Sequence, residues 1–326
     1  MSFPTICGRW RGIHSAKMEI LDAQVHLNQL LPTWQTDPID QALKAAVATM
    51  DAVGVDAVII YESRGFDSKN RPNLGRELPN GAIRAEFPYS ALAVETYPER
   101  FAYIWRIDAR DEELEQVAAD VSKKPGVVGL RIVPTPNAGE IEQLENGGFD
   151  RLFAAAQDSG LPLFTWLPGR AHLLEPILKK YPKLQVILDH VGVGVAPPIK
   201  GGPLPPTMAS SLTPTLEGRL AELEGVLALA QYPNLGLKWC HAPVALSAEE
   251  YPYRDMQPLL RRTLDAFGAE RVVWASDYTV SKPEQSWAQT LHYLLDSDVM
   301  SETETEWFFG KAARKLLNWP KANSAT

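Results

Sequence analysis

Short apolar runs alternate with longer amphipathic stretches along most of the chain. The short runs are rich in β-branched and aromatic residues, which indicates strands that are buried on both faces. They lie at 18–26, 55–61, 101–108, 127–133, 162–167, 184–190, 235–240 and 271–277. Strands that alternate with helices form parallel sheets. Eight such units favour a closed (β/α)₈ TIM barrel over an open sheet, and no GxGxxG follows the first strand.

The stretches between these runs have apolar residues at helical spacing, and several end in glycine or proline. They are 39–54, 112–126, 149–160, 173–182, 216–233, 256–268 and 301–319. Ser301 and Glu304 fit a capping box at the start of the last stretch. Two long segments, 62–86 and 193–215, join a strand to a helix, where barrels carry their active sites. We expect lids or binding loops there, with plain surface insertions as the alternative.

The length of 326 residues and the 45% share of hydrophobic residues suit one large barrel. No linker divides the chain. We therefore expect an N-terminal extension at 1–17, a single barrel domain at 18–320 and a tail at 321–326.

The formal net charge of −8, without a basic run, argues against binding to nucleic acid or to an anionic membrane. The first residues lack a signal-peptide core, and no apolar run has the roughly 18 residues of a membrane span. Cys7 and Cys240 are too few for a disulfide framework and are expected to be reduced thiols. These features predict a cytoplasmic protein.

Chemically useful side chains stand at the predicted carboxyl ends of the strands, where barrel side chains face the pocket mouth. Strict alternation along the first strand would put Asp22, Gln24 and His26 on one face. A lone strand-end histidine is usually structural. Two histidines and an aspartate that recur at the strand ends of one barrel indicate a site able to bind metal, activate water or move protons. These three residues are His26, His190 and Asp277.

Two cations, Arg131 and Lys238, occupy further strand ends and could hold a substrate carboxylate, or could form salt bridges at the rim. Several aromatic residues at strand ends could line a cavity or simply pack. They are Tyr61, Trp105, Trp166 and Tyr278.

Five segments of the chain resemble the amidohydrolase-related family. ILDAQVHL is similar to its first-strand signature, which usually reads Asp-x-His-x-His. VGLRIV, VILDHVG and VVWASDY resemble the fourth, sixth and eighth strands, and FFGKAARKLL resembles the closing helix. The family includes metal-dependent decarboxylases of aromatic acids, a metal-independent 2-pyrone-4,6-dicarboxylate lactonase, sugar lactonases and iron-dependent oxygenases. The resemblance implies an amidohydrolase-like barrel with His26, His190 and Asp277 at metal-site or catalytic positions.

Two positions depart from the family pattern. Gln24 stands where the first histidine would be, and Trp166 stands roughly where some members carry a fifth-strand histidine. One divalent ion, zinc or manganese, could still bind through His26, His190 and Asp277, but an enzyme without metal is equally consistent with the sequence. Without metal, Asp277 would activate water as a general base, aided by the two histidines.

These features predict a hydrolase that opens a small carboxylated cyclic ester or a related ring compound. The residues expected to contact this substrate are Gln24, Arg131, Trp166, Lys238, His241 and Tyr278. The first alternative is a metal-dependent decarboxylase of an aromatic acid, which is a lyase. The second is a scaffold subunit that pairs with an active relative, and a homodimer is the default for an oligomer.

Overall fold

The computed structural model describes residues 18–26, 39–61, 65–66, 72–73, 75–134, 139–197, 209–281 and 285–319. The predicted extension 1–17 and tail 321–326 lie outside these residues, as do parts of the two long predicted loops. Among the described residues, no helix combines the length and the apolar character that crossing a bilayer requires.

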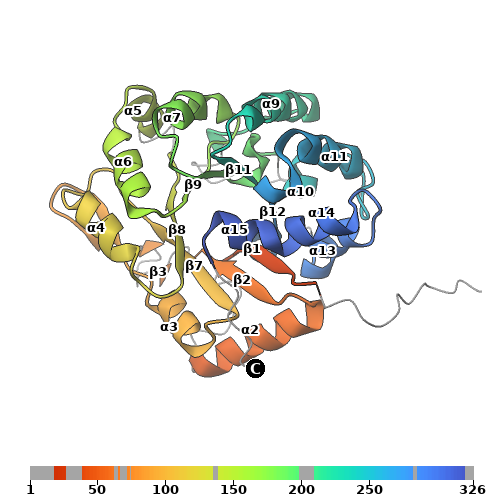
Figure 1. Cartoon of the computed structure of the whole chain (residues 1–326), viewed down its shortest axis with the longest axis horizontal. Coiled ribbons are helices and arrows are strands. Elements are labelled where there is room, and N and C mark those ends of the chain that lie inside the picture. The colour runs from red at the N-terminus through yellow and green to blue at the C-terminus, as the bar shows by residue number, and fades with distance from the viewer. Residues whose placement is uncertain are drawn as a thin grey trace, which may run out of the picture.

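Eight parallel strands form the centre of the molecule, and helices surround them (Figure 1). Each predicted strand is present in the predicted order, which confirms the (β/α)₈ barrel. Their bounds are β1 (Leu21–Val25), β2 (Ala57–Ile60), β7 (Phe101–Arg106), β8 (Val127–Ile132), β9 (Leu163–Thr165), β10 (Val186–Leu188), β11 (Leu235–Cys240) and β12 (Val272–Ala275). Every neighbouring pair in this series runs parallel.

Each predicted helical stretch contains a helix. The helices are α2 (Ile39–Val53), α3 (Pro88–Thr96), α4 (Leu114–Val121), α5 (Glu140–Glu145), α6 (Asp150–Ser159), α7 (Leu174–Lys180), α9 (Leu216–Ala228), α10 (Ala242–Leu246), α11 (Met256–Phe267), α12 (Tyr278–Ser281), α13 (Trp287–Leu295), α14 (Glu302–Glu306) and α15 (Ala312–Leu316). The last predicted helix is divided by a π-helical turn, η6 (Trp307–Lys311), between α14 and α15. Ser301 and Glu304 form the predicted capping box.

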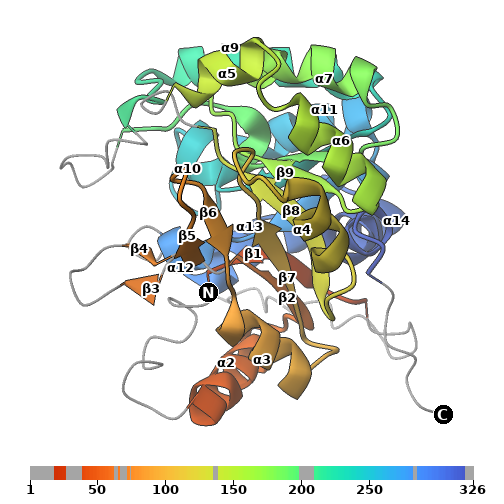
Figure 2. The same cartoon turned by 90° about the vertical axis from the view of Figure 1, so that its left-hand side faces the viewer.

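Shorter elements complete the fold. Single 3₁₀ turns are η2 (Ala171–Leu173), η3 (His190–Gly192), η4 (Leu229–Gln231) and η5 (Ala269–Arg271). Two small antiparallel pairs lie within the predicted loop 62–86, namely β3 (Gly65–Phe66) with β4 (Pro72–Asn73) and β5 (Gly75–Glu77) with β6 (Ile83–Ala85). Figure 2 shows them on the same side of the molecule as α10 and α12, which follow β11 and β12. They therefore belong to the face on which the strands end.

The buried apolar residues form two clusters. The larger cluster fills the space between the strands and the surrounding helices. The smaller one fills the barrel interior and includes Ala312, Ala313 and Leu316 of α15, which lies near the centre of the ring in Figure 1. Arg314 of the same helix pairs with Glu19, just before β1, at 2.9 Å. Since β1 begins beside Glu19, α15 closes the amino-terminal end of the barrel and leaves the carboxyl end for a site.

A buried carboxylate joins the first and last strands. Asp22 accepts hydrogen bonds from Ser276 N at 2.9 Å, from Trp287 Nε1 at 2.8 Å and from the Ser276 hydroxyl. Asp277 N–H then donates to Gln24 O at 3.1 Å, so the barrel is nearly closed. Burial raises the pKa of Asp22 to about 6, although these donors oppose the rise.

The pairing of β1 with β2 is irregular between Asp22 and Val25. A bulge of this kind breaks the two-residue alternation of side chains. Asp22 consequently contacts Ser276 and Trp287, whereas Gln24 faces His190 and Lys238. The predicted shared face for these first-strand residues is therefore wrong for Asp22.

Candidate active site

Three side chains are presented by residues in the left-handed backbone region. His241 directly follows β11, whereas His190 and Asp277 lie two residues beyond the ends of β10 and β12. The φ angles are 52° at His190, 58° at His241 and 46° at Asp277. Residues other than glycine adopt this region rarely, at a cost on the order of 1–3 kcal/mol in sparsely populated cases. Such conformations gather at functional sites because the surrounding fold must hold them in place.

These three residues meet at the barrel mouth. One ligand atom from each of His190, His241 and Asp277 lies within 4.8 Å of the other two. On the other side of the carboxylate, His26 Nε2 lies 3.1 Å from Asp277 Oδ1. His241 Nδ1 lies 4.0 Å from Asp277 Oδ2. Asp277 is thus the centre of the group, with a histidine facing each of its two oxygens.

The geometry suits one divalent ion. Because metal–ligand bonds are about 2.1 Å long, two ligand atoms of one ion lie at most about 4.2 Å apart. The ligand atoms of this group lie within 4.8 Å of one another, so the most distant pair would have to approach by roughly half an ångström. Two imidazoles and one carboxylate leave a coordination position open for water or substrate, which is the pattern of catalytic zinc sites. The residues that fit this role are His190, His241 and Asp277.

The protonation states of two members suit metal binding. Burial lowers the pKa of His190 to about 3, so its imidazole is neutral near pH 7. Burial alone would raise the pKa of Asp277, but His26, followed by His241 and His190, holds it well below its usual value. A neutral imidazole and an ionised carboxylate are the forms that bind metal.

Asp189 holds the two predicted substrate-binding cations. Its oxygens lie 2.8 Å from Arg131 Nη2 and 2.6 Å from Lys238 Nζ, and the Lys238 and Asp189 side chains have no exposed surface. The contacts are ionic in character, since neither Asp189 oxygen has a well-aligned hydrogen-bond donor among the described residues. Burial raises the pKa of Asp189, but these two cations lower it more.

Lys238 also fixes the orientation of Gln24. Its ammonium group can only donate, and it does so to Gln24 Oε1 at 2.9 Å. The amide nitrogen of Gln24 therefore faces His190 Nε2, at 3.5 Å. In this arrangement Gln24 Nε2 donates to His190 Nε2, and an ion held by His190 would take the lone pair of a ring nitrogen in place of this hydrogen bond or of the ring proton. The Gln24 oxygen faces Lys238 rather than the group of His190, His241 and Asp277.

Aromatic rings pack around the histidines. Trp166 meets His190 edge to face with ring centroids 5.5 Å apart, and Tyr61 meets His26 in the same way at 5.4 Å. The Arg131 guanidinium lies 3.9 Å over the Tyr61 ring. Tyr278 stacks on Trp287, outside this group, at 4.3 Å.

The structure brings most of the sequence-predicted site residues together. His26 and His190 both lie beside Asp277, as predicted, and Gln24, Trp166 and His241 contact this group. The group that could hold a metal differs from the predicted one, because it contains His241 in place of His26. Arg131 and Lys238 instead form ion pairs with Asp189, the residue that precedes His190. Sequence reasoning assigned no role to Asp189. The available signal was its place before His190 on an otherwise apolar strand, because a buried carboxylate requires a partner.

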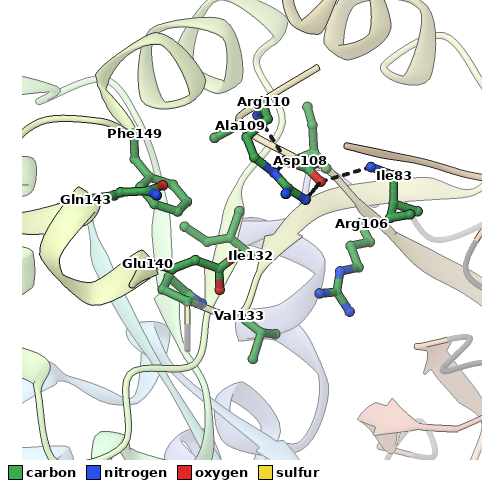
Figure 3. Close-up of a pocket in the computed structure, with 12 residues that line it drawn as sticks. Ile83, Arg106, Asp108, Ala109, Arg110, Ile132, Val133, Glu140, Gln143 and Phe149 are labelled. Atoms are coloured by element: carbon green, nitrogen blue, oxygen red, sulfur yellow. Dashed lines mark hydrogen bonds and ion pairs between the residues drawn. The ribbon is translucent and has the colours of Figure 1, made fainter. Parts of the chain in front are cut away.

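A pocket of about 130 Å³ lies at the ends of β7 and β8. Figure 3 shows its lining, which comes from these strand ends, from β6 and from the α5 region. None of the three residues around Asp277 belongs to this lining. Arg106 of the pocket is aligned in register with Arg131, so the pocket adjoins the site along the mouth of the barrel.

Comparisons with known proteins agree with this architecture. The sequence model of the amidohydrolase family matches residues 21–319. A curated relative, the L-fucono-1,5-lactonase of Burkholderia ambifaria, is 30% identical over 118 residues, which cover 35% of this chain and 33% of that protein. The match thus spans about a third of the relative's length.

Three solved structures share the fold. An amidohydrolase from Burkholderia multivorans with bound zinc has a TM-score of 0.64 at 16% identity, covering 93% of this chain and 100% of that one. A candidate 2-pyrone-4,6-dicarboxylic acid hydrolase from Pseudomonas putida has a TM-score of 0.60 at 17% identity, covering 93% and 98%. A 5-carboxyvanillate decarboxylase from Sphingomonas paucimobilis has a TM-score of 0.56 at 17% identity, covering 92% and 99%.

Proposed function

Because the chain belongs to the amidohydrolase family, we propose that it is a hydrolase that opens a small cyclic ester bearing a carboxylate. The observation that carries the proposal is the contact of Asp277 with histidines on both of its oxygens, at the open end of a barrel. The lactonase relative supports the choice of a cyclic ester.

We propose that His190, His241 and Asp277 hold one divalent ion, zinc or manganese. When bound, such an ion supplies an acidified water and polarises the substrate carbonyl. Asp277 needs this help, because a carboxylate with a lowered pKa is a weak base. The metal-bound relative in the family is consistent with this assignment.

The residues of this chain then have distinct roles. Asp277 accepts a proton from the attacking water, and His26, whose Nε2 lies 3.1 Å from Oδ1, orients the carboxylate and stabilises its ionised form. Water adds to the carbonyl carbon, the ring C–O bond breaks, and the ring oxygen takes a proton to give a hydroxy acid. Gln24, fixed by Lys238, orients His190, and Trp166 packs against the same imidazole.

The substitution Asp277→Asn tests this proposal. Asparagine tolerates a left-handed backbone and has nearly the same shape, so the fold should persist. We expect kcat/KM for lactone hydrolysis to fall by roughly 10³-fold, because general-base catalysis is lost. Acid release from a panel of five- and six-membered lactones measures the rate.

Asp265→Asn, which changes an exposed carboxylate, is the matched control and should keep full activity. An Asp277→Asn protein that retains more than about a tenth of the wild-type kcat/KM would remove the assigned base.

A decarboxylase is the second candidate, favoured by the fold shared with the 5-carboxyvanillate decarboxylase and by the same metal-binding group. The two reactions differ in their products. Ring opening of a lactone releases a proton near neutral pH, whereas replacing a ring carboxylate by hydrogen consumes a proton and releases carbon dioxide. Measuring the release or uptake of protons and the release of carbon dioxide in one assay separates the two reactions.

A further inference from the structure

The pocket at the ends of β7 and β8 contains a cation that the sequence analysis did not consider. Arg106 is the last residue of β7, is half-buried and lines this pocket. Among the residues that the structure describes, none forms a hydrogen bond or ion pair with its guanidinium, and no dashed line reaches it in Figure 3. A half-buried cation without a partner is costly unless a ligand or water satisfies it.

The other charges of the pocket have partners. Asp108 accepts two hydrogen bonds from the Arg110 side chain, at 2.7 and 3.0 Å, one from Arg110 N at 3.0 Å and one from Ile83 N at 2.9 Å. Glu140 acts on Arg110 through its charge. Apart from Gln143, the remaining lining is apolar and consists of Ile83, Ile107, Ala109, Ile132, Val133, Pro134 and Phe149. Among the described residues, Arg106 is therefore the charged side chain of this pocket that has no protein partner and can bind a ligand.

The pocket adjoins the proposed active site. Arg106 is in register with Arg131 on the neighbouring strand, and strands lie about 4.8 Å apart, so both side chains leave the sheet on the same face. Arg131 in turn contacts Tyr61, and Tyr61 contacts His26. A small ring bound near Asp277 could thus extend a substituent towards Arg106.

The cations that were expected to bind a substrate carboxylate are already paired. Arg131 and Lys238 share Asp189, and Lys238 has no exposed surface. An arginine matches a carboxylate with two parallel hydrogen bonds, and it does so best where no other anion competes. We propose that Arg106 binds an anionic substituent of the substrate, most simply a carboxylate, with the apolar lining holding its carbon skeleton.

This inference rests on the proposed function only for the identity of the ring, so its test measures binding rather than turnover. The probes are benzoate and benzamide, which have nearly the same shape and differ by one charge. Titration calorimetry gives the preference of each protein for benzoate over benzamide. Wild type should prefer benzoate, and Arg106→Gln should reduce that preference by roughly 10- to 100-fold while leaving benzamide affinity unchanged.

Two further variants make the result specific. Arg262→Gln removes one exposed cation that pairs with Glu224 far from the pocket, and it should keep the wild-type preference. Arg106→Lys keeps the charge but loses the paired donors, so its preference should fall by a smaller factor; it carries the test if Arg106→Gln does not fold.

A preference for benzoate that is equal in wild type and both Arg106 variants would overturn the inference, because the carboxylate would then be held elsewhere, for example by the group around Asp277. No preference in wild type would also overturn it. An Arg106-dependent preference in a protein that opens no lactone would support the inference and count against the proposed function, so the two failures are distinguishable.

Discussion

Asp189 compensates the buried positive charges that lie next to the site. Its single negative charge is the counter-ion of both Arg131 and Lys238, in a region with almost no exposed surface. Removing one partner of a buried ion pair leaves an uncompensated charge, whereas removing both costs much less. Arg131 lies in β8, Lys238 lies in β11 and Asp189 directly follows β10, so the cluster links strands on both sides of β9 and β10 at the mouth.

We predict that Asp189→Asn lowers the free energy of unfolding by about 3–5 kcal/mol, because two buried cations lose their counter-charge. Lys238→Met in the same chain should restore part of this loss by removing one of the cations. Urea unfolding of wild type, both single variants and the double variant gives the coupling energy. If the two losses simply add in the double variant, the cluster does not have the ionic role described.

The residue scale also shows the limit of sequence reasoning. His26, His190 and Asp277 were identifiable, because polar residues at the ends of apolar strands stand out. His241 was predicted as a substrate contact, but its place beside Asp277 was not, because it depends on a left-handed turn after β11 that no glycine marks. The pairing of Arg131 and Lys238 with Asp189 depends on which strands are neighbours and in what register.

At the scale of elements, the strands were predictable because each is apolar on both faces, and the long helices because each has one apolar face. The helices α3 and α13 escaped notice. α3 begins with Phe87 and Pro88 and lacks a clear apolar stripe, so its sequence resembles a loop. α13 carries a capping box formed by Ser286 and Gln289, a signal that was present in the sequence.

The stability that Glu304 provides at the start of α14 depends on pH, and this dependence can be measured. Hydrogen bonds from Arg261, followed by that from Ser301 N, lower the pKa of Glu304 from 4.5 to about 2. A carboxyl group whose pKa is lower in the folded state stabilises the fold above its unfolded pKa. This contribution should be complete above about pH 4.5 and should disappear as the pH falls towards 2.

We predict that Glu304→Gln costs about 1 kcal/mol of unfolding free energy at pH 7, because glutamine keeps the capping bond but loses the ion pair with Arg261. The difference from wild type should shrink below pH 4, where wild type itself loses the charge. Urea unfolding at several pH values measures it, with Glu145→Gln, an exposed residue at the end of α5, as the control. A difference that is constant from pH 7 to 3 would contradict the assignment.

For the whole molecule, the barrel explains why residues so distant in sequence meet. Asp22 joins β1 to the end of β12, and α15 fills the opposite end of the barrel. The mouth is then the end at which loops and strand ends can provide chemistry. The family resemblance predicted this architecture, but the departures at Gln24 and Trp166 left the presence of metal undecided from the sequence.

The proposed metal site of His190, His241 and Asp277 is tested most directly by the metal content of the purified protein. Elemental analysis after dialysis against a zinc or manganese salt and then against buffer should find about one ion per chain in wild type. A His190→Ala, His241→Ala double variant should hold less than a tenth of that amount, because two of the three ligands are lost. An Arg262→Gln control should match wild type. Wild type without bound metal, or a double variant that retains a full equivalent, would contradict the account.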